Sequence, residues 1–89
     1  MPTVWIPALL QPLSGGIQKV SVPGDTVHQV IDNLEMRFPG MRERLLEGDR
    51  LRPSLAVVVD GEISQEKLHH HLEENSEVIF MPAISGGQR

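Results

Sequence analysis

The sequence predicts one α+β domain in which a single main helix packs on one face of a mixed β-sheet. Short β-branched or alternating apolar runs lie near both ends of the chain, an amphipathic helical stripe lies between them, and turn residues separate these segments. With 89 residues, the chain has room for only one modest core. This size argues against an enclosed active site built from many residues.

A β-hairpin is predicted at the start of the chain. Residues 3–10 (TVWIPALL) are rich in β-branched and large apolar side chains, but Pro7 cannot donate to a β-ladder and should leave this strand short or bulged. Residues 13–16 (LSGG) provide a turn, and residues 17–22 alternate as the second strand. Because Trp5 lies within the first strand, we expect it to be a packing residue rather than a binding anchor.

The clearest element is a helix that follows residues 23–26 (PGDT). Thr26 and Gln29 match a capping box, and apolar side chains then recur on one face at helical spacing. The helix should end before Pro39, and residues 41–46 add a further helical turn or two. The expected buried stripe consists of Val27, Val30, Ile31, Leu34 and Phe38.

Two further strands are predicted in the second half of the chain. Residues 54–59 (SLAVVV) form a near-continuous apolar run, which predicts a strand buried on both faces at the centre of the sheet. An Asp-Gly turn follows, and then residues 62–72 show no single pattern, with Ile63 and Leu68 as the expected anchors. The last strand is predicted over residues 77–84 and leads directly into the C-terminal SGGQR.

The composition argues against several classes of function. The chain has 8 Lys and Arg against 12 Asp and Glu, a net charge of -4, and only one Trp and two Phe, so nucleic acid is not an expected partner. The absence of Cys excludes disulfides, thiolate metal sites and cysteine nucleophiles. Since no signal-peptide pattern or run of about 18 apolar residues occurs, we expect a cytoplasmic protein without a membrane partner.

Three consecutive histidines, His69, His70 and His71, invite interpretation as a metal site. Three adjacent residues cannot all face one metal from a single strand or helix, and complementary ligands are missing from the sequence. We therefore expect a solvated turn and no metal at these positions. No Ser/His/Asp set or paired carboxylates stand out either, so no catalytic residue is assigned and the chain is not expected to be an enzyme.

The order of elements, which ends in an apolar strand followed at once by Gly-Gly, resembles the β-grasp fold of ubiquitin-like proteins, and most of all the MoaD/ThiS family of sulfur carriers. Residues 4–16 (VWIPALLQPLSGG) and 39–48 (PGMRERLLEG) are particularly similar to the CysO-type carriers within that family. The other matching stretches are residues 23–26, 27–34, 57–62 and 77–87. The resemblance implies a four- to five-stranded mixed sheet with one main helix on one face, in a β-grasp domain over residues 1–84. A flexible C-terminal tail is expected over residues 85–89.

The resemblance also implies a carrier that is modified at its own C-terminal carboxylate. In this family an E1-like adenylating enzyme uses ATP to activate the last Gly, a sulfur donor converts it to a thiocarboxylate, and an acceptor enzyme takes the sulfur for cysteine or another sulfur metabolite. Gly87 matches that glycine, and Gly86 with Ser85 would thread the tail into the partner, because glycine has no Cβ to obstruct a narrow channel. The ATP is used by the partner, and no cofactor is expected on this chain.

Gln88 and Arg89 depart from the family pattern, since carriers that act directly end at the second Gly. The resemblance therefore implies that a JAMM-type metalloprotease first removes these two residues. Met81 and Pro82 lie where relatives contact the activating enzyme with apolar groups, which makes them candidate partner contacts, with a core or strand-end role left open for Met81. The chain is expected to be a monomer.

Three other functions remain open at the level of sequence. A ubiquitin-like protein modifier would join Gly87 to the lysine amines of target proteins. A small subunit of a larger synthase, as in molybdopterin synthase, would insert its tail into that enzyme, although the two-residue extension would obstruct it. A noncovalent β-grasp interaction module would not depend on Gly87 at all.

Overall fold

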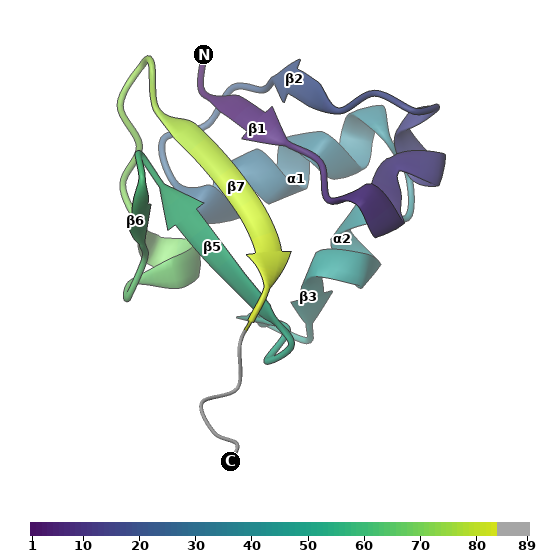
Figure 1. Ribbon diagram of the computed structural model, residues 1–89. Helices are drawn as coiled ribbons and strands as arrows, with labels where there is room; N and C mark the ends of the chain where they lie inside the picture. The colour runs from purple at the N-terminus through teal and green to yellow at the C-terminus, as the bar shows by residue number, and fades with distance from the viewer. Residues whose placement is uncertain (84–89) are drawn as a thin grey trace.

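The computed structural model of the chain describes residues 1–83 and shows a five-stranded mixed sheet with two α-helices on one of its faces (Figure 1). The five strands lie in the order β2-β1-β7-β5-β6, and β3 and β4 form a separate two-stranded ribbon. The strands are β1 (Thr3–Trp5), β2 (Lys19–Ser21), β3 (Leu46–Glu47), β4 (Arg50–Leu51), β5 (Leu55–Val59), β6 (Glu62–Ile63) and β7 (Glu77–Pro82). The helices are α1 (Val27–Arg37) and α2 (Met41–Leu45), with two 3-10 helices, η1 (Ala8–Ser14) and η2 (Lys67–His69).

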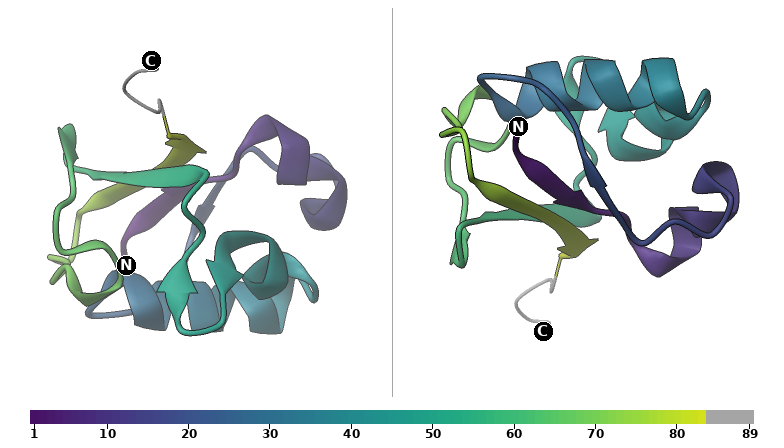
Figure 2. Two further views of the ribbon diagram at one scale, coloured as in Figure 1. Left: turned by 90° about the horizontal axis from the view of Figure 1, so that it is seen from below. Right: turned by 90° about the horizontal axis from the view of Figure 1, so that it is seen from above.

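The first and last strands meet in the middle of the sheet. β1 and β7 pair in parallel, with Val4 opposite Val78, while β1 pairs antiparallel with β2 and β7 pairs antiparallel with β5. β7 is therefore the central strand and runs toward the end of the molecule away from the N-terminus (Figure 1). Views along the sheet show α1 and α2 on the same side of it (Figure 2). This arrangement confirms the predicted β-grasp fold.

Helix α1 begins and packs as its sequence predicts. The backbone N–H of Gln29 donates to Oγ1 of Thr26, the N-cap residue, at 3.2 Å. Phe38, at the end of the apolar stripe, is half-buried. The fully buried helix residues are Val27, Val30, Ile31 and Leu34. The strands complete the core with Val4, Val20, Val57, Val59, Val78 and Phe80.

The first strand is short, as expected from Pro7, but the residues after it do not continue the strand. β1 ends at Trp5, and Pro7 becomes the N-cap of η1, which places Leu9 and Leu10 in a 3-10 helix. Proline has no N–H to extend the ladder, and its fixed φ suits the start of a helical turn. The β1–β2 connection therefore contains a short helix in place of the predicted tight turn.

The prediction that the apolar run at 54–59 forms a central strand buried on both faces is wrong. Only Val57 and Val59 of β5 are buried, because α1 and α2 cover one face of the sheet and no helix of residues 1–83 covers the opposite face of β5. Ile63 pairs with Val58 on that helix-free face and is 66% exposed, so its predicted anchor role is also wrong. The second expected anchor, Leu68, is buried.

Trp5 also lies on the helix-free face of the sheet. Its side chain is half-buried, and Nζ of Lys19 lies 5.2 Å from the centre of its ring, within cation–π distance. The tryptophan thus packs on the sheet surface and is not part of the core. Among residues 1–83, no helix combines the length and the apolar character that crossing a membrane requires.

Candidate functional site

The predicted reactive tail begins where β7 ends. Pairing continues one residue past the strand, because the N–H of Ala83 donates to the carbonyl oxygen of Ser54 at 2.8 Å. Gly87 follows Ala83 by four positions, so at about 3.5 Å per residue it lies at most ~14 Å from Ala83. The predicted site residues Ser85, Gly86 and Gly87 and the extension Gln88 and Arg89 lie outside the described residues.

Met81 and Pro82, the candidate partner contacts, are the last two residues of β7. Their register partners on β5 are Ala56 and Leu55. Both residues are exposed, and 37% of the Met81 surface is accessible, whereas the preceding Phe80 faces the core. Met81 therefore occupies a strand end outside the core, and its contact with a partner stays a prediction.

A groove of about 710 Å³ opens beside this end of β7. Residues 7–10 at the start of η1 form one wall, and Arg44 of α2, Arg52 and the adjoining ends of β5 and β7 form the rest. Its lining is mostly apolar and includes the buried side chain of Phe80 and the 90% exposed side chain of Leu9. The structure thus places a mostly apolar surface directly beside the end of β7.

The exposed position of Leu9 follows from how η1 is held. The N–H of Leu10 donates to the carbonyl oxygen of Pro7 at 2.9 Å, and the side-chain amide of Gln11 donates to the carbonyl oxygen of Ile6 at 3.1 Å. Leu10 turns into the core and is 8% exposed. Since adjacent residues of a 3-10 helix point in different directions, Leu9 must then face solvent.

Two arginines give the groove a positive charge. Nε and Nη2 of Arg52 donate to the carbonyl oxygen of Glu43 at 3.0 and 2.7 Å, which fixes this guanidinium against α2. Arg44 is exposed and makes no hydrogen bond or ion pair with the rest of residues 1–83. No Asp or Glu of the described chain lines the groove. An anionic group would find at least one unpaired guanidinium there.

Helix α2, which carries Arg44, is positioned by a carboxylate of α1. Glu35 accepts hydrogen bonds from the backbone N–H groups of Arg42 at 2.8 Å and Gly40 at 3.1 Å. These bonds, first the one from Arg42 and then the one from Gly40, lower the pKa of Glu35. The ionised carboxylate thus satisfies N–H groups at the start of α2 that have no partner within that helix.

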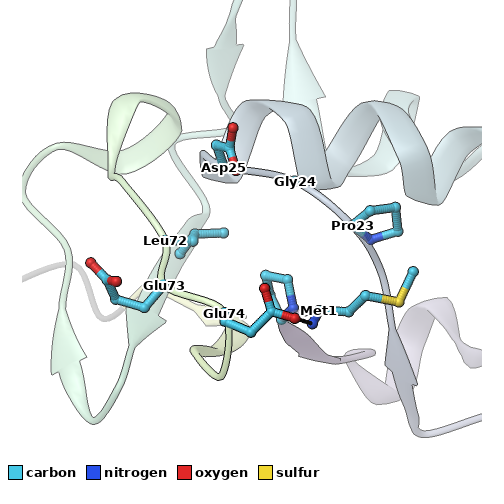
Figure 3. A pocket seen from close by; sticks show the side chains of 8 residues that line it. Met1, Pro23, Gly24, Asp25, Leu72, Glu73 and Glu74 are labelled. Carbon is cyan, nitrogen blue, oxygen red and sulfur yellow. Dashed lines mark hydrogen bonds and ion pairs between the residues drawn. The ribbon is translucent and has the colours of Figure 1, made fainter.

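A second, smaller pocket of about 210 Å³ lies beside the N-terminus (Figure 3). Asp25, Glu73 and Glu74 contribute to its lining, together with Met1 and Gly24. The N-terminal ammonium of Met1 lies 2.7 Å from Oε2 of Glu74, and this hydrogen bond and the attraction between the two charges lower the pKa of Glu74. Its acidic lining contrasts with the basic, apolar lining of the groove.

The three consecutive histidines do not converge on one point. His69 is exposed in η2, and His71 is exposed and forms an isolated bridge with Thr26. His70 is half-buried, with Nδ1 2.7 Å from Oγ of Ser64, so the prediction of a solvated turn is wrong for this residue. Residues 1–83 contain no group of three His, Asp or Glu side chains placed to hold a metal.

The groove is absent from the predictions because residues 8–10 were expected to continue a strand. In a strand, Leu9 and Leu10 would alternate across the sheet and form no shared rim. The usable signal was Pro7 followed within five residues by Pro12, since two prolines so close together disfavour a paired strand and favour a short helical turn. The position of Arg44 opposite that turn follows only from the packing of α2.

The chain matches a protein family along almost its whole length. The model of the ThiS family matches residues 4–87. The sulfur carrier protein CysO of Mycobacterium tuberculosis is 33% identical over 90 residues, which cover 96% of this chain and 97% of the relative. The protein of the same name from Mycobacterium bovis shows the same identity and coverage.

Solved structures agree with this match. A chain in the BexX/CysO complex of Amycolatopsis orientalis superposes with a TM-score of 0.89 at 30% identity, covering 98% of this chain and 100% of that one. CysO of M. tuberculosis gives a TM-score of 0.87 at 31% identity, with 94% and 100% covered. SAMP1 of Haloferax volcanii gives 0.72 at 27% identity, with 97% and 98% covered. These neighbours share both the fold and the full length of the domain.

Proposed function

Because this chain belongs to the ThiS family, we propose that it is a sulfur carrier protein, not an enzyme, and that its working group is the carboxylate of Gly87. The observation that carries the proposal is the extent of the family match, which ends at Gly87 and leaves only Gln88 and Arg89 outside it at this end of the chain. The last described hydrogen bond between β7 and its neighbour is made by Ala83, four positions before Gly87. A short tail after the last strand suits a group that must enter a partner's active site.

The proposed cycle begins with hydrolysis of the Gly87–Gln88 peptide bond by a JAMM-type metalloprotease, which frees the carboxylate of Gly87. In an E1-like partner, a carboxylate oxygen then attacks the α-phosphorus of ATP, and pyrophosphate leaves. Sulfide-level sulfur from a donor adds to the carbonyl carbon and displaces AMP, which leaves a thiocarboxylate. An acceptor enzyme takes this sulfur for cysteine or another sulfur metabolite.

The chain's own contribution to this chemistry is to hold the C-terminal carboxylate where a partner's active site can reach it. β7 pairs with β1 over residues 77–79 and with β5 over residues 78–82, so the end of the strand has a fixed position on a rigid scaffold. Gly86 and Gly87 have no Cβ, which lets the backbone approach a nucleotide closely. The carrier thereby needs no catalytic side chain of its own.

The intact mass of the protein from its native cells tests the proposal. We expect a chain that ends at Gly87, with a fraction in which one carboxylate oxygen is replaced by sulfur. A matched variant, Gly87→Ala, should be produced and folded normally but should carry no sulfur. A chain that keeps Gln88 and Arg89 under every growth condition would overturn the proposal and leave a noncovalent interaction module.

A second candidate function is that of a ubiquitin-like protein modifier, and the likeness to SAMP1, a small archaeal modifier protein, favours it. In this case the activated carbonyl of Gly87 would form an amide with lysine amines of other proteins. Higher-mass conjugates that react with an antibody to this chain, and that disappear with Gly87→Ala, would support conjugation. Both functions require the same trimming and activation, so they separate only at the last step.

A further inference from the structure

We propose that residues 64–70, here called the η2 loop, open and close with pH. In this device His70 bonds Ser64 while its ring is neutral and turns to Glu66 when its ring is protonated. The loop contains η2 and the buried Leu68. In mildly acidic solution the loop should open more often while the sheet and α1 stay folded. The inference goes beyond the proposed function and does not rest on it.

The side chain of Ser64 closes the η2 loop. Its Oγ lies 2.7 Å from Nδ1 of His70 and accepts a hydrogen bond from the backbone N–H of Lys67 at 2.8 Å. Two short-range backbone bonds shape the turn inside the loop, from the N–H of His69 to the carbonyl of Glu66 at 3.0 Å and from the N–H of His70 to that of Lys67 at 3.1 Å. The contact between Ser64 and His70 thus joins the two ends of the loop.

The backbone of the loop is strained, so it depends on this contact. Lys67 has a φ of +53°, in the left-handed region that residues with a Cβ adopt only at a cost. Beyond the turn, the carbonyl of His70 accepts a hydrogen bond from the N–H of Val27 at 3.1 Å, which ties the loop to the start of α1. Loss of the Ser64–His70 bond would therefore favour opening of the loop before the rest of the fold.

The hydroxyl of Ser64 is best satisfied when Nδ1 of His70 carries no proton. A neutral ring with its proton on Nε2 accepts the hydroxyl proton at Nδ1, while Oγ accepts from Lys67. With Nδ1 protonated, Oγ would face two N–H donors, and its own proton would have no acceptor among the hydrogen bonds of residues 1–83. Because Ser64 is only 4% exposed, water cannot readily satisfy that proton, and the unmade bond costs stability.

Glu66 offers the protonated ring a second partner. Its Oε1 lies 3.8 Å from Nδ1 of His70, and no other carboxylate of residues 1–83 forms an ion pair with this histidine. The side chain of Glu66 is 69% exposed, so it has room to turn toward the ring. A hydrogen bond between two charged groups is shorter and stronger than one between neutral groups. Protonation should therefore move Nδ1 from Ser64 to Glu66.

The remaining charged groups around the loop are exposed and act on His70 only weakly, through solvent. η2 packs against α1 and β4. At the start of α1, Asp25 and His28 lie on either side of Val27, and His28 pairs with Asp32. The β3–β4 turn and β4 contribute Asp49 and Arg50, which line a pocket of about 290 Å³ with Glu66, Lys67 and His69, and His71 follows the loop. The positive charges of Arg50 and Lys67 oppose protonation, whereas Asp49 favours it.

Amide hydrogen exchange of the full chain, measured by NMR at about pH 7.5 and about pH 5, tests this inference, because histidine ordinarily changes charge in this range. Protection factors are compared, since they remove the intrinsic pH dependence of exchange. We expect the protection of the Lys67, His69 and His70 amides to fall about tenfold in acid, as the loss of one hydrogen bond predicts. The protection of Ile31 in α1 should change by less than about twofold. Proton–nitrogen correlation spectra should show an unprotonated Nδ1 on His70 at about pH 7.5.

Four variants separate the contributions of the individual side chains. His70→Gln removes the titrating ring, so the protection of the loop should be the same at both pH values. Ser64→Ala removes the hydroxyl, so protection should be low at both. Glu66→Gln should move the loss of protection to lower pH, because the charged ring then lacks its carboxylate. The matched control is His69→Gln, which changes the neighbouring exposed histidine, whose ring has no hydrogen bond in residues 1–83, and should leave the pH dependence intact.

Several results would overturn the inference. Equal protection of the wild-type loop at both pH values would show that the loop does not respond to pH. A pH dependence that survives His70→Gln, or that disappears in His69→Gln, would assign the titration to another group. A proton on Nδ1 of His70 near neutral pH, or a loss of protection that extends through α1, would also contradict it. None of these results concerns Gly87, so the carrier proposal is tested separately.

Discussion

The two ends of the sheet differ in how their residues are bonded: one end is closed by hydrogen bonds between elements, and the other leaves side chains exposed beside a groove. At the end near the N-terminus, hydrogen bonds tie the elements together: the N–H of Thr3 donates to Ser76, that of Glu77 to the side chain of Asp60, and that of Leu72 to Asp25. At the end where β7 stops, Leu9 and Arg44 extend into solvent beside an open groove. The contacts at the first end stabilise the fold, whereas the exposed side chains at the second end are available to bind another molecule.

The difference explains how a domain of 89 residues can present a tail without a catalytic site of its own. The closed end joins β1, β7 and the start of α1, so it supports the central strand from which the tail emerges. The open end exposes apolar and charged side chains to water. A domain with such a small core can expose only a limited area of apolar surface and stay folded. Substitutions at the closed end should therefore affect stability, and those at the open end should affect binding.

The largest expected effect on stability is at the closed end, from Gly24→Ala. Gly24 has a φ of +153°, and a Cβ there would lie 2.7 Å from Cγ2 and 2.9 Å from the backbone nitrogen of Val30. We expect a loss of about 3 kcal/mol in the free energy of unfolding, measured by urea denaturation. The KM for activation of the folded protein should stay unchanged.

Gly16→Ala is the matched control for this steric effect. Gly16 also has a positive φ, +89°, but apart from its two chain neighbours no residue among 1–83 has a heavy atom within 4 Å of the position that a Cβ would take there. We expect a loss of only about 1 kcal/mol, from backbone strain alone. Equal losses in the free energy of unfolding for the two variants would show that the clash of the new Cβ with Val30 does not contribute to the effect of Gly24→Ala.

An intermediate effect on stability is expected from Glu35→Gln, where α1 meets the start of α2 and away from the lining of the groove. The lowered pKa of Glu35 means that its ionised form stabilises the fold above the pKa of an unfolded Glu, and that this contribution is lost as the pH falls through the folded pKa. The wild type should melt at a higher temperature than Glu35→Gln at neutral pH, and the difference should shrink in acid. Glu47→Gln, which changes an exposed carboxylate with no hydrogen bond to the rest of residues 1–83, is the matched control and should melt like the wild type at neutral pH.

The smallest effect is expected from Glu74→Gln at the closed end. Its pKa is also lowered, so its contribution is likewise present at neutral pH and lost in acid, but the ion pair with the N-terminal ammonium is exposed on both sides, at 57% and 83%. The melting temperature should fall only slightly, and about 0.5 M salt should remove the difference by screening, as expected from a Debye length of about 4 Å. A change as large as that of Glu35→Gln would contradict the view that backbone hydrogen bonds, not this ion pair, hold the closed end together.

Local patterns predicted the elements whose structure depends on near neighbours. Thr26 caps α1 and the stripe from Val27 to Leu34 is buried, because capping and helical spacing are set within a few residues. Pro7 ended the first strand as expected. The prediction that residues 54–59 form a strand buried on both faces was wrong. Apolar side chains indicate a preference for burial, but the number of faces that are covered depends on where the helices pack.

The sequence identifies the candidate diglycine but gives no indication of the groove beside the end of β7. The diglycine at positions 86 and 87 can be identified from the sequence because its proposed chemistry needs only a short tail after the last strand. The groove beside it cannot, because Leu9, Arg44 and Phe80 are far apart along the chain and meet only when η1, α2 and β7 pack together.

The sequence by itself thus determined the fold class and the main helix, since both depend on residue type and short-range order, and it is also the sole basis for proposing the diglycine as the reactive site. Only the tertiary structure decided that β7 would be the central strand, that one face of β5 would lack a covering helix, and that an arginine without an ion-pair partner in residues 1–83 would lie beside an exposed leucine. The physical reason is that burial and pairing between distant segments depend on the packing of the whole chain, which no local pattern specifies.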